Sequence, residues 1–191
     1  VEPDAAARVE RARLASTVPS RVEEAVEEYR ALDEHPDPAV GARVLELWTG
    51  LRRRQGQAGN VRTLAGWLVE RYPDTDQAAE VVFLRGDLAH DRGDWEGALQ
   101  HYREVAAMAP TRTLAGVARM RMGQVQLHTG DRDGALATFR GYLEDFPTGR
   151  RWAEASFWSG RILVERGDTS EAVPFLDRIL AEDPFSYYAA E

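Results

Sequence analysis

The sequence predicts an all-α protein, a solenoid in which antiparallel helix pairs stack on one another. One pattern of two glycines, an alanine, an aromatic residue or leucine, and a proline occurs three times between residues 79 and 184, and each copy follows the last by 37 residues. The copies are Gly86, Gly93, Ala98, Tyr102 and Pro110, then Gly123, Gly130, Ala135, Phe139 and Pro147, then Gly160, Gly167, Ala172, Leu176 and Pro184. Self-similarity at a fixed period of this length is typical of helical repeat proteins, whose units bury their apolar sides only against neighbouring units.

Two helices are expected within residues 1–34. Residues 5–15 are rich in helix-forming side chains, and Pro19 with Ser20 ends this segment and opens the next. Apolar side chains then recur at spacings of three and four residues, at Val22, Ala25, Val26, Tyr29 and Leu32. This spacing places them on one side of a second helix.

Residues 39–72 predict a second pair, which departs from the later repeats in detail. Its two apolar stripes are Val40, Val44, Leu47, Trp48 and Leu51, and then Val61, Leu64, Ala65, Leu68 and Tyr72. We expect a turn at residues 56–60 between them. Five of the nine prolines fall on one 37-residue spacing, at positions 36, 73, 110, 147 and 184. The period therefore extends over the N-terminal half, with its glycines lost.

The three clear repeats carry helix-end and helix-start signals. The first helix of each pair should end at a left-handed glycine, namely Gly93, Gly130 or Gly167. The second should begin after an aspartate that caps its free N–H groups, namely Asp94, Asp131 or Asp168. Asp168 with Glu171 fits a capping box. In the middle repeat the second helix should bury a continuous apolar face, made of Ala135, Leu136, Phe139, Tyr142, Leu143 and Phe146.

Another set of glycines, Gly86, Gly123 and Gly160, lies inside the first helix of each pair. A glycine there destabilises a helix by about 1 kcal/mol relative to alanine, so its recurrence indicates a close approach between helices. The alanines twelve residues later, Ala98, Ala135 and Ala172, are the expected opposite wall.

Composition excludes several classes of function. The formal net charge of −8 argues against a duplex nucleic-acid surface, and no apolar run is long enough to span a membrane. The chain has no cysteine, which excludes disulfides and thiolate chemistry, and it has no lysine, which excludes a phosphate loop of the Gly-Lys type. We find no nucleophile–base pair and expect neither a cofactor nor a metal. The start at Val1 suggests a processed protein or an excised fragment.

The spacing from Gly86 through Ala98 and Tyr102 to Pro110, repeated twice more, resembles the tetratricopeptide repeat. The resemblance covers residues 79–184 well and 1–72 loosely, and the period exceeds the family's usual length of about 34 residues. It implies ten or eleven helices in a right-handed superhelix of about five units. We divide the chain into divergent repeats over 1–73, three tetratricopeptide-like repeats over 74–184, and the start of another over 185–191. The longer connection between repeats, such as residues 111–113, resembles that of bacterial cell-envelope proteins.

The C-terminal part is similar to the superhelical region of bacterial soluble lytic transglycosylases. The similarity rests on residues 152–161 and on Asp183-Pro-Phe-Ser-Tyr-Tyr-Ala189. It implies a non-catalytic arm of a peptidoglycan-cleaving enzyme, since the family's lysozyme-like domain has no counterpart in this chain. A free-standing envelope adaptor that binds a protein is the alternative, and a cytoplasmic regulatory domain is a third. We expect the periplasm or cell envelope, with the cytoplasm as the other possibility.

The resemblance also implies a ligand groove along the first helices of the pairs. Its expected lining residues are Phe83, Asp87, His90, Asp91, Met120, Gln124, His128, Phe157, Arg161 and Glu165. The groove would hold a protein or peptide, or a glycan reached through an adjoining domain, although a purely structural groove is an equal alternative. Asp87, His90 and Asp91 have a spacing that metal ligands use, but a polar helix face explains them better. Trp95 and Tyr102 are expected in the core, while Trp152 and Trp158 suit either the core or an interface.

Overall fold

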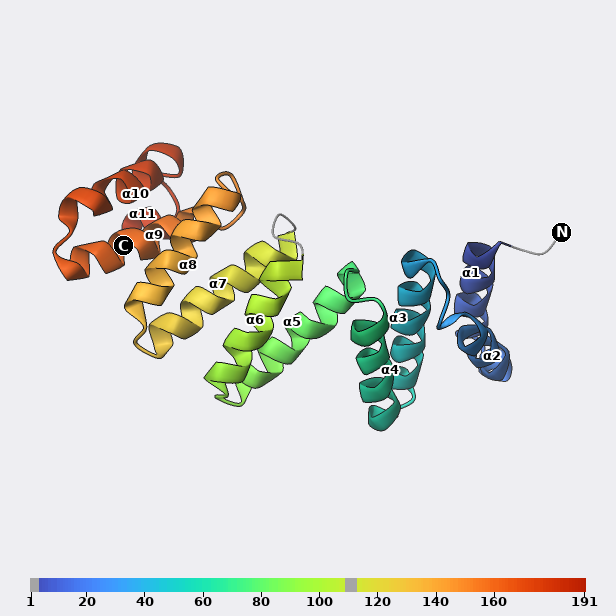
Figure 1. Ribbon diagram of the computed structural model, residues 1–191. Helices are drawn as coiled ribbons and strands as arrows, with labels where there is room; N and C mark the ends of the chain where they lie inside the picture. The colour runs from blue at the N-terminus through green and yellow to red at the C-terminus, as the bar shows by residue number, and fades with distance from the viewer. Residues whose placement is uncertain (1–3, 109–112) are drawn as a thin grey trace. The chain divides into compact units, whose positions relative to one another are not determined.

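The regular structure of the chain is helical throughout the described residues (Figure 1). The structure is a computed structural model that describes residues 4–108 and 113–191. Its elements, in chain order, are α1 (Ala5–Ala15), the short 3-10 helix η1 (Pro19–Arg21), α2 (Val22–Leu32), α3 (Pro38–Arg54), α4 (Ala58–Arg71), α5 (Asp76–Asp91), α6 (Trp95–Met108), α7 (Thr113–His128), α8 (Arg132–Asp145), α9 (Trp152–Arg166), α10 (Thr169–Glu182) and α11 (Tyr187–Ala190). The predicted all-α class is confirmed over these residues.

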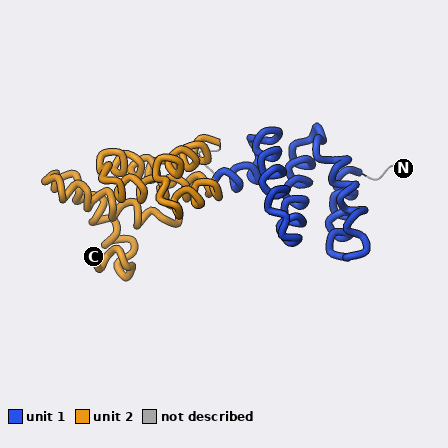
Figure 2. Tube along the Cα trace, turned by 90° about the horizontal axis from the view of Figure 1, so that it is seen from below, with its two compact units in different colours: residues 1–82 blue, residues 83–191 orange. Residues whose placement is uncertain are grey.

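The chain forms two compact units, residues 1–82 and 83–191 (Figure 2). In the first unit α1 contacts α2 and α3, and α3 contacts α4. Tyr29 of α2 is fully buried, and its ring centroid lies 6.5 Å from that of Trp48 in α3. The Tyr72 hydroxyl lies 2.9 and 3.0 Å from the carbonyl oxygens of Asp33 and His35, and its one proton is shared between them in a three-centre hydrogen bond. This hydrogen bond gives a donor to backbone carbonyl oxygens in the loop between α2 and α3. Without it these oxygens would be removed from water and have no hydrogen-bond partner.

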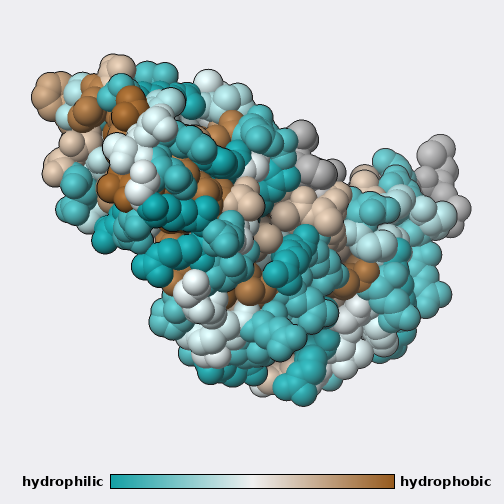
Figure 3. All heavy atoms as spheres, turned by 60° about the vertical axis from the view of Figure 1, so that its left-hand side comes forward, coloured by the Kyte–Doolittle hydropathy of each residue, from teal (hydrophilic) through white to brown (hydrophobic). Residues whose placement is uncertain are grey.

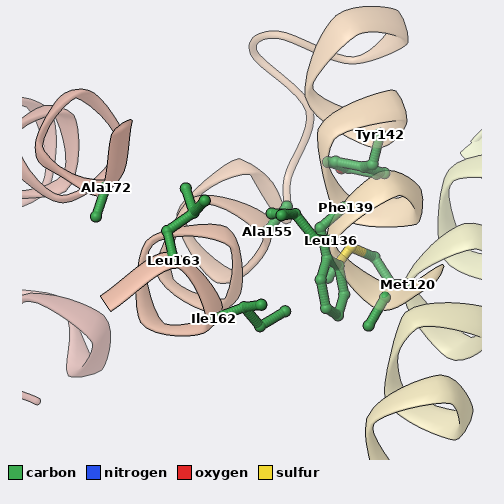
Figure 4. Packing of buried hydrophobic residues seen from close by; sticks show 9 residues of the cluster. Met120, Leu136, Phe139, Tyr142, Ala155, Ile162, Leu163 and Ala172 are labelled. Atoms are coloured by element: carbon green, nitrogen blue, oxygen red, sulfur yellow. The ribbon is translucent and has the colours of Figure 1, made fainter. Parts of the chain in front are cut away.

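In the second unit each helix from α6 to α10 contacts the next one in the chain. Buried side chains of α7, α8, α9 and α10 form one cluster (Figure 4), whose members include Met120, Leu136, Phe139, Tyr142, Ala155, Ile162, Leu163 and Ala172. The apolar face predicted for α8 lies in this cluster, with Leu143 and Phe146 partly buried beside it. Successive contacts of this kind bury the apolar side of each helix, as a solenoid requires.

The left-handed glycines are confirmed and extend further back than expected. Gly93, Gly130 and Gly167 have φ angles of 74°, 84° and 89°. Gly56, at φ 71°, lies 37 residues before Gly93, so the prediction that the N-terminal half had lost its repeat glycines is wrong at this position. The chain needs a positive φ to reverse between paired helices, and glycine adopts it without a Cβ clash.

The helix glycines do mark close approaches, but the opposite wall is not the predicted one. A Cβ built on Gly86 would lie 2.7 Å from the ring of Tyr102, and one on Gly123 would lie 2.4 Å from the ring of Phe139. A Cβ on Gly160 would lie 2.6 Å from the side chain of Leu176. The residue sixteen positions later, rather than the alanine twelve positions later, provides the nearest atoms. A large side chain from the second helix needs this space, whereas an alanine methyl does not reach across.

Two of the predicted aspartate caps form. The Asp94 carboxylate accepts a hydrogen bond of 3.0 Å from the N–H of Gly97, and Asp131 accepts one of 2.9 Å from the N–H of Gly134. Both bonds satisfy a first-turn N–H group that has no partner within the helix.

The capping box predicted for Asp168 and Glu171 is wrong. Asp168 makes no side-chain bond to the helix, and its own N–H donates to the carbonyl oxygen of Leu163 at 2.9 Å. The Glu171 carboxylate instead accepts from Arg140 of α8 at 2.9 Å. The N–H that a capping box would occupy is already used by the turn after α9, so Glu171 can bind across to another helix.

Other expectations differ in detail or lie outside the description. The turn expected at 56–60 is shorter, because α4 already begins at Ala58. The expectations for Pro110 and for residues 111–112 of the longer connection fall outside the described residues. No helix within residues 4–108 and 113–191 combines the length and hydrophobicity that a membrane span requires.

Candidate binding surface

The first helices of the second unit are joined by a series of polar contacts, which we call the polar ladder. On α5 and α7, Asp87 Oδ1 lies 3.8 Å from Arg121 Nε. Arg121 in turn donates to Gln124 Oε1 at 3.4 Å. Gln124 donates to Glu154 Oε1 of α9 at 2.9 Å, and Arg151 donates to the other oxygen of Glu154 at 2.9 Å. The ladder therefore runs over α5, α7 and α9, the helices on which the groove was predicted.

Asp87 also contacts Tyr102 of α6. The Tyr102 hydroxyl donates to Asp87 Oδ1 at 2.7 Å. Burial of the Tyr102 ring, and next this hydrogen bond, raise the pKa of the Tyr102 hydroxyl well above its usual range, so it remains a donor. Tyr102 is fully buried, as expected from the sequence. Within the described part of the chain, no three His, Asp or Glu side chains lie close enough together to hold a metal ion.

A half-buried tryptophan lies between two of the predicted groove histidines. The ring centroid of Trp95 is 5.2 Å from that of His90 and 4.3 Å from that of His128. The sequence placed Trp95 in the core, but its ring is only half-buried. Asp91 is largely exposed beside His90. These side chains form an accessible aromatic and polar cluster at the C-terminal ends of α5 and α7.

On α9 the predicted groove residues take different roles. Phe157 is buried, with its ring centroid 5.5 Å from that of Tyr188 in α11. Glu165 accepts from Arg132 at 3.0 Å and from Arg161 at 3.3 Å, and these hydrogen bonds lower the pKa of the Glu165 carboxyl. Glu165 is therefore charged at neutral pH and links α8 to α9.

Two of the ten predicted groove residues cannot contact a ligand in this structure. Met120 is 1% exposed within the buried cluster of α7 to α10, and Phe157 is 8% exposed. Both follow the register of the groove, but their side chains turn inward, where apolar side chains are more stable. The other eight remain at least partly accessible, namely Phe83, Asp87, His90, Asp91, Gln124, His128, Arg161 and Glu165. We call this set, with Arg121, the first-helix face.

Sequence reasoning missed Arg121 and Glu154. Arg121 stands three residues before Gln124 on α7, so the two side chains share a helix face, and its charge is opposite to that of Asp87. That spacing could have indicated the contact. Glu154 stands three residues after Arg151 and has the opposite charge, so the same spacing could have indicated that pair, whereas no local spacing indicated its bond with Gln124 of α7. The surface shown in Figure 3 is largely hydrophilic, with smaller hydrophobic patches between the polar side chains.

Comparison with known proteins agrees with this architecture. A family model described as a tetratricopeptide repeat-like domain matches residues 12–179. None of the curated proteins compared with the chain matches it significantly. The solved structure of YrrB, described as a TPR protein with an unusual peptide-binding site, shares 18% identity at a TM-score of 0.54, with 98% of this chain and 90% of that chain covered.

Two further solved structures have a similar fold. A structure of MamA AMB-1 shares 16% identity at a TM-score of 0.54, and the match covers 97% of this chain and 96% of that one. PilF of Pseudomonas aeruginosa shares 14% identity at a TM-score of 0.51, over 91% of this chain and 73% of that one. Identities this low show a shared fold and nothing more specific.

Proposed function

Because the chain belongs to the tetratricopeptide repeat-like domain family, we propose that it is a protein-binding module without catalytic activity of its own. The observation that carries the proposal is the first-helix face. It presents carboxylates, an amide, imidazoles and guanidinium groups on α5, α7 and α9, and the polar ladder fixes several of them in place. A surface ordered before binding loses less conformational entropy when a ligand docks.

The chemistry of this face suits an extended peptide. Gln124 and the histidines can donate to or accept from a peptide backbone, while Phe83, and Trp95 of α6 beside the face, offer partly accessible rings to its side chains. YrrB, which has a similar fold, is described as having a peptide-binding site, and this is compatible with the role proposed for this chain.

A peptide library displayed on phage and panned against the purified chain tests the proposal. Enriched peptides should bind in solution, and His128→Ala or Asp91→Ala should each weaken them at least about fivefold, because a lost polar contact of about 1 kcal/mol has this effect. Asp177→Ala is the matched control, since Asp177 is an exposed aspartate on α10. Failure to enrich any peptide, or equal binding by all variants, would contradict the proposal.

A finer version of this proposal is the superhelical arm of a lytic transglycosylase in the bacterial envelope. Its support is the sequence similarity of residues 152–161 and 183–189 to that family; in the structure α11 lies in the second of these stretches, and its Tyr188 contacts Phe157. A free-standing adaptor, in the envelope or the cytoplasm, fits the same face. A lysozyme-like domain encoded downstream of Glu191 would favour the transglycosylase arm, and a stop codon there would favour the adaptor. The chain alone should release no muropeptides from purified peptidoglycan above a heat-inactivated control.

A further inference from the structure

The second unit also contains a cavity, whose lining includes none of the histidines of the first-helix face. It has a volume of about 590 Å³ and lies between the start of α7, the end of α8, the connection that follows α8, the start of α9, and α11. This volume falls within the range of about 300–1,000 Å³ typical of ligand sites. Its lining combines three aromatic residues with three charged ones, namely Tyr142, Phe146, Tyr188, Arg150, Arg151 and Glu154.

One wall of the cavity is aromatic. The rings of Tyr142 and Phe146 are stacked with their centroids 5.1 Å apart. Gly116 faces them, and a Cβ at this position would lie 3.1 Å from the Tyr142 ring and 3.4 Å from the Phe146 ring. The Tyr142 hydroxyl accepts from the backbone N–H of Arg151 at 3.1 Å, which ties the wall to the connection before α9. The wall is therefore fixed, and it suits an apolar side chain.

The charges around the cavity are unequal. Both oxygens of Glu154 are occupied, one by Gln124 and the other by Arg151 at 2.9 Å each. Arg151 is thus matched to Glu154. Arg150 also lines the cavity, is exposed, and has no hydrogen-bond or ion-pair partner among the residues that the structure describes. The cavity keeps one unmatched positive charge on a chain whose formal net charge is −8.

We propose that this cavity anchors an acidic segment of a peptide partner, with one carboxylate on Arg150 and a neighbouring apolar side chain against the Tyr142–Phe146 wall. The inference rests on the proposed function, because it assigns a second contact point to the same kind of ligand. Arginine binds carboxylates through two parallel N–H groups, which orients the ligand as well as attracting it.

Tyr188 of α11 adds a hydroxyl donor to the lining of the cavity. Burial of its ring, and next the nearby charge of Glu154, raise the pKa of the Tyr188 hydroxyl, so it stays protonated at neutral pH. A protonated hydroxyl can donate to a second carboxylate oxygen. Arg151 offsets part of the charge of Glu154 through its bond of 2.9 Å.

Titration followed by amide NMR tests the inference. The probe is the capped tripeptide acetyl-Leu-Asp-Asp-amide, and the control is acetyl-Leu-Asn-Asn-amide, which has the same shape without the charge. We expect the acidic probe to shift the amide signals of Gly116, Gly149 and Arg150, and to bind at least about tenfold more tightly than the control, as a charge-assisted bond provides.

Two variants complete the test. Arg150→Gln should weaken the acidic probe about tenfold and remove its preference over the neutral one, and Arg150→Glu should abolish binding. Arg103→Gln is the matched control, since Arg103 is an exposed arginine of α6 that does not line the cavity.

Equal binding of the two probes, or an unchanged affinity in Arg150→Gln, would overturn the inference. If library peptides bind the first-helix face while the cavity signals stay unshifted, the inference fails and the proposed function stands. If no peptide binds at all, both fail.

Discussion

Replacement of Gly123 by alanine is the most direct test of how the paired helices meet. Gly123 lies in the interior of α7, where alanine alone would stabilise the helix by about 1 kcal/mol. The new Cβ, however, would lie 2.4 Å from the ring of Phe139, which is fully buried and cannot turn aside. Overfilling a packed core costs about 1–3 kcal/mol, so Gly123→Ala should be destabilising by roughly 0–2 kcal/mol in total.

Gly141 provides the matched control. It lies inside α8, and a Cβ built on it meets nothing within 4 Å. Gly141→Ala should therefore stabilise the protein by about 1 kcal/mol through helix propensity alone. The two variants contain the same chemical change, so their difference in unfolding free energy, about 1–3 kcal/mol, isolates the clash. Urea denaturation followed by far-ultraviolet circular dichroism measures it as a shift in midpoint at constant slope.

A double variant tests whether the destabilisation by Gly123→Ala comes from contact with the Phe139 ring. Phe139→Leu alone should destabilise the protein, because it leaves space beside a glycine. In the Gly123→Ala background the same change should cost less, since the methyl group takes part of that space, with a coupling of about 0.5–3 kcal/mol. If Gly123→Ala is as stable as Gly141→Ala, or if the two sites show no coupling, the close approach is not as described.

Three further predictions concern the turns, the caps and pH. Gly130→Ala should destabilise the protein by about 1–2 kcal/mol, because a Cβ is strained at a φ of 84°, and urea denaturation measures the loss. Asp131→Ala should cost about 1 kcal/mol in the same assay, because it removes a side-chain cap, whereas Asp168→Ala should cost clearly less because Asp168 makes none. Burial and the bond to Asp87 raise the Tyr102 pKa above its ordinary value of 10.0, so stability is complete below that pH and falls as pH rises past it. This fall should be smaller in Tyr102→Phe, and a pH series of denaturation curves that shows no difference would refute the assignment.

The candidate surface shows where register reasoning works and where it stops. Counting in steps of 37 placed Asp87 and Gln124 on the first helices of two successive pairs, and the structure has them on α5 and α7 with polar partners. The same count also placed Met120 and Phe157 on that face, and both are buried. A repeat register fixes which helix a residue occupies and its approximate side. The inward or outward turn of one side chain depends on which neighbouring helix has space for it.

The sequence by itself determined the helical class, the reversal points between paired helices and the need for close contact at three helix glycines. The first two are local properties, because a helix face or a left-handed turn depends on residues only a few positions apart, and the third was inferred from the recurrence of glycine at one position of the repeat. The tertiary structure alone decided that Tyr102, Phe139 and Leu176 fill the spaces beside those glycines. It also decided that Glu154 bridges Gln124 and Arg151, and that Arg150 is left unmatched beside an aromatic wall. Such pairings join side chains from different helices. Their distances depend on how the large side chains pack together in the core, and a local sequence pattern does not contain this information.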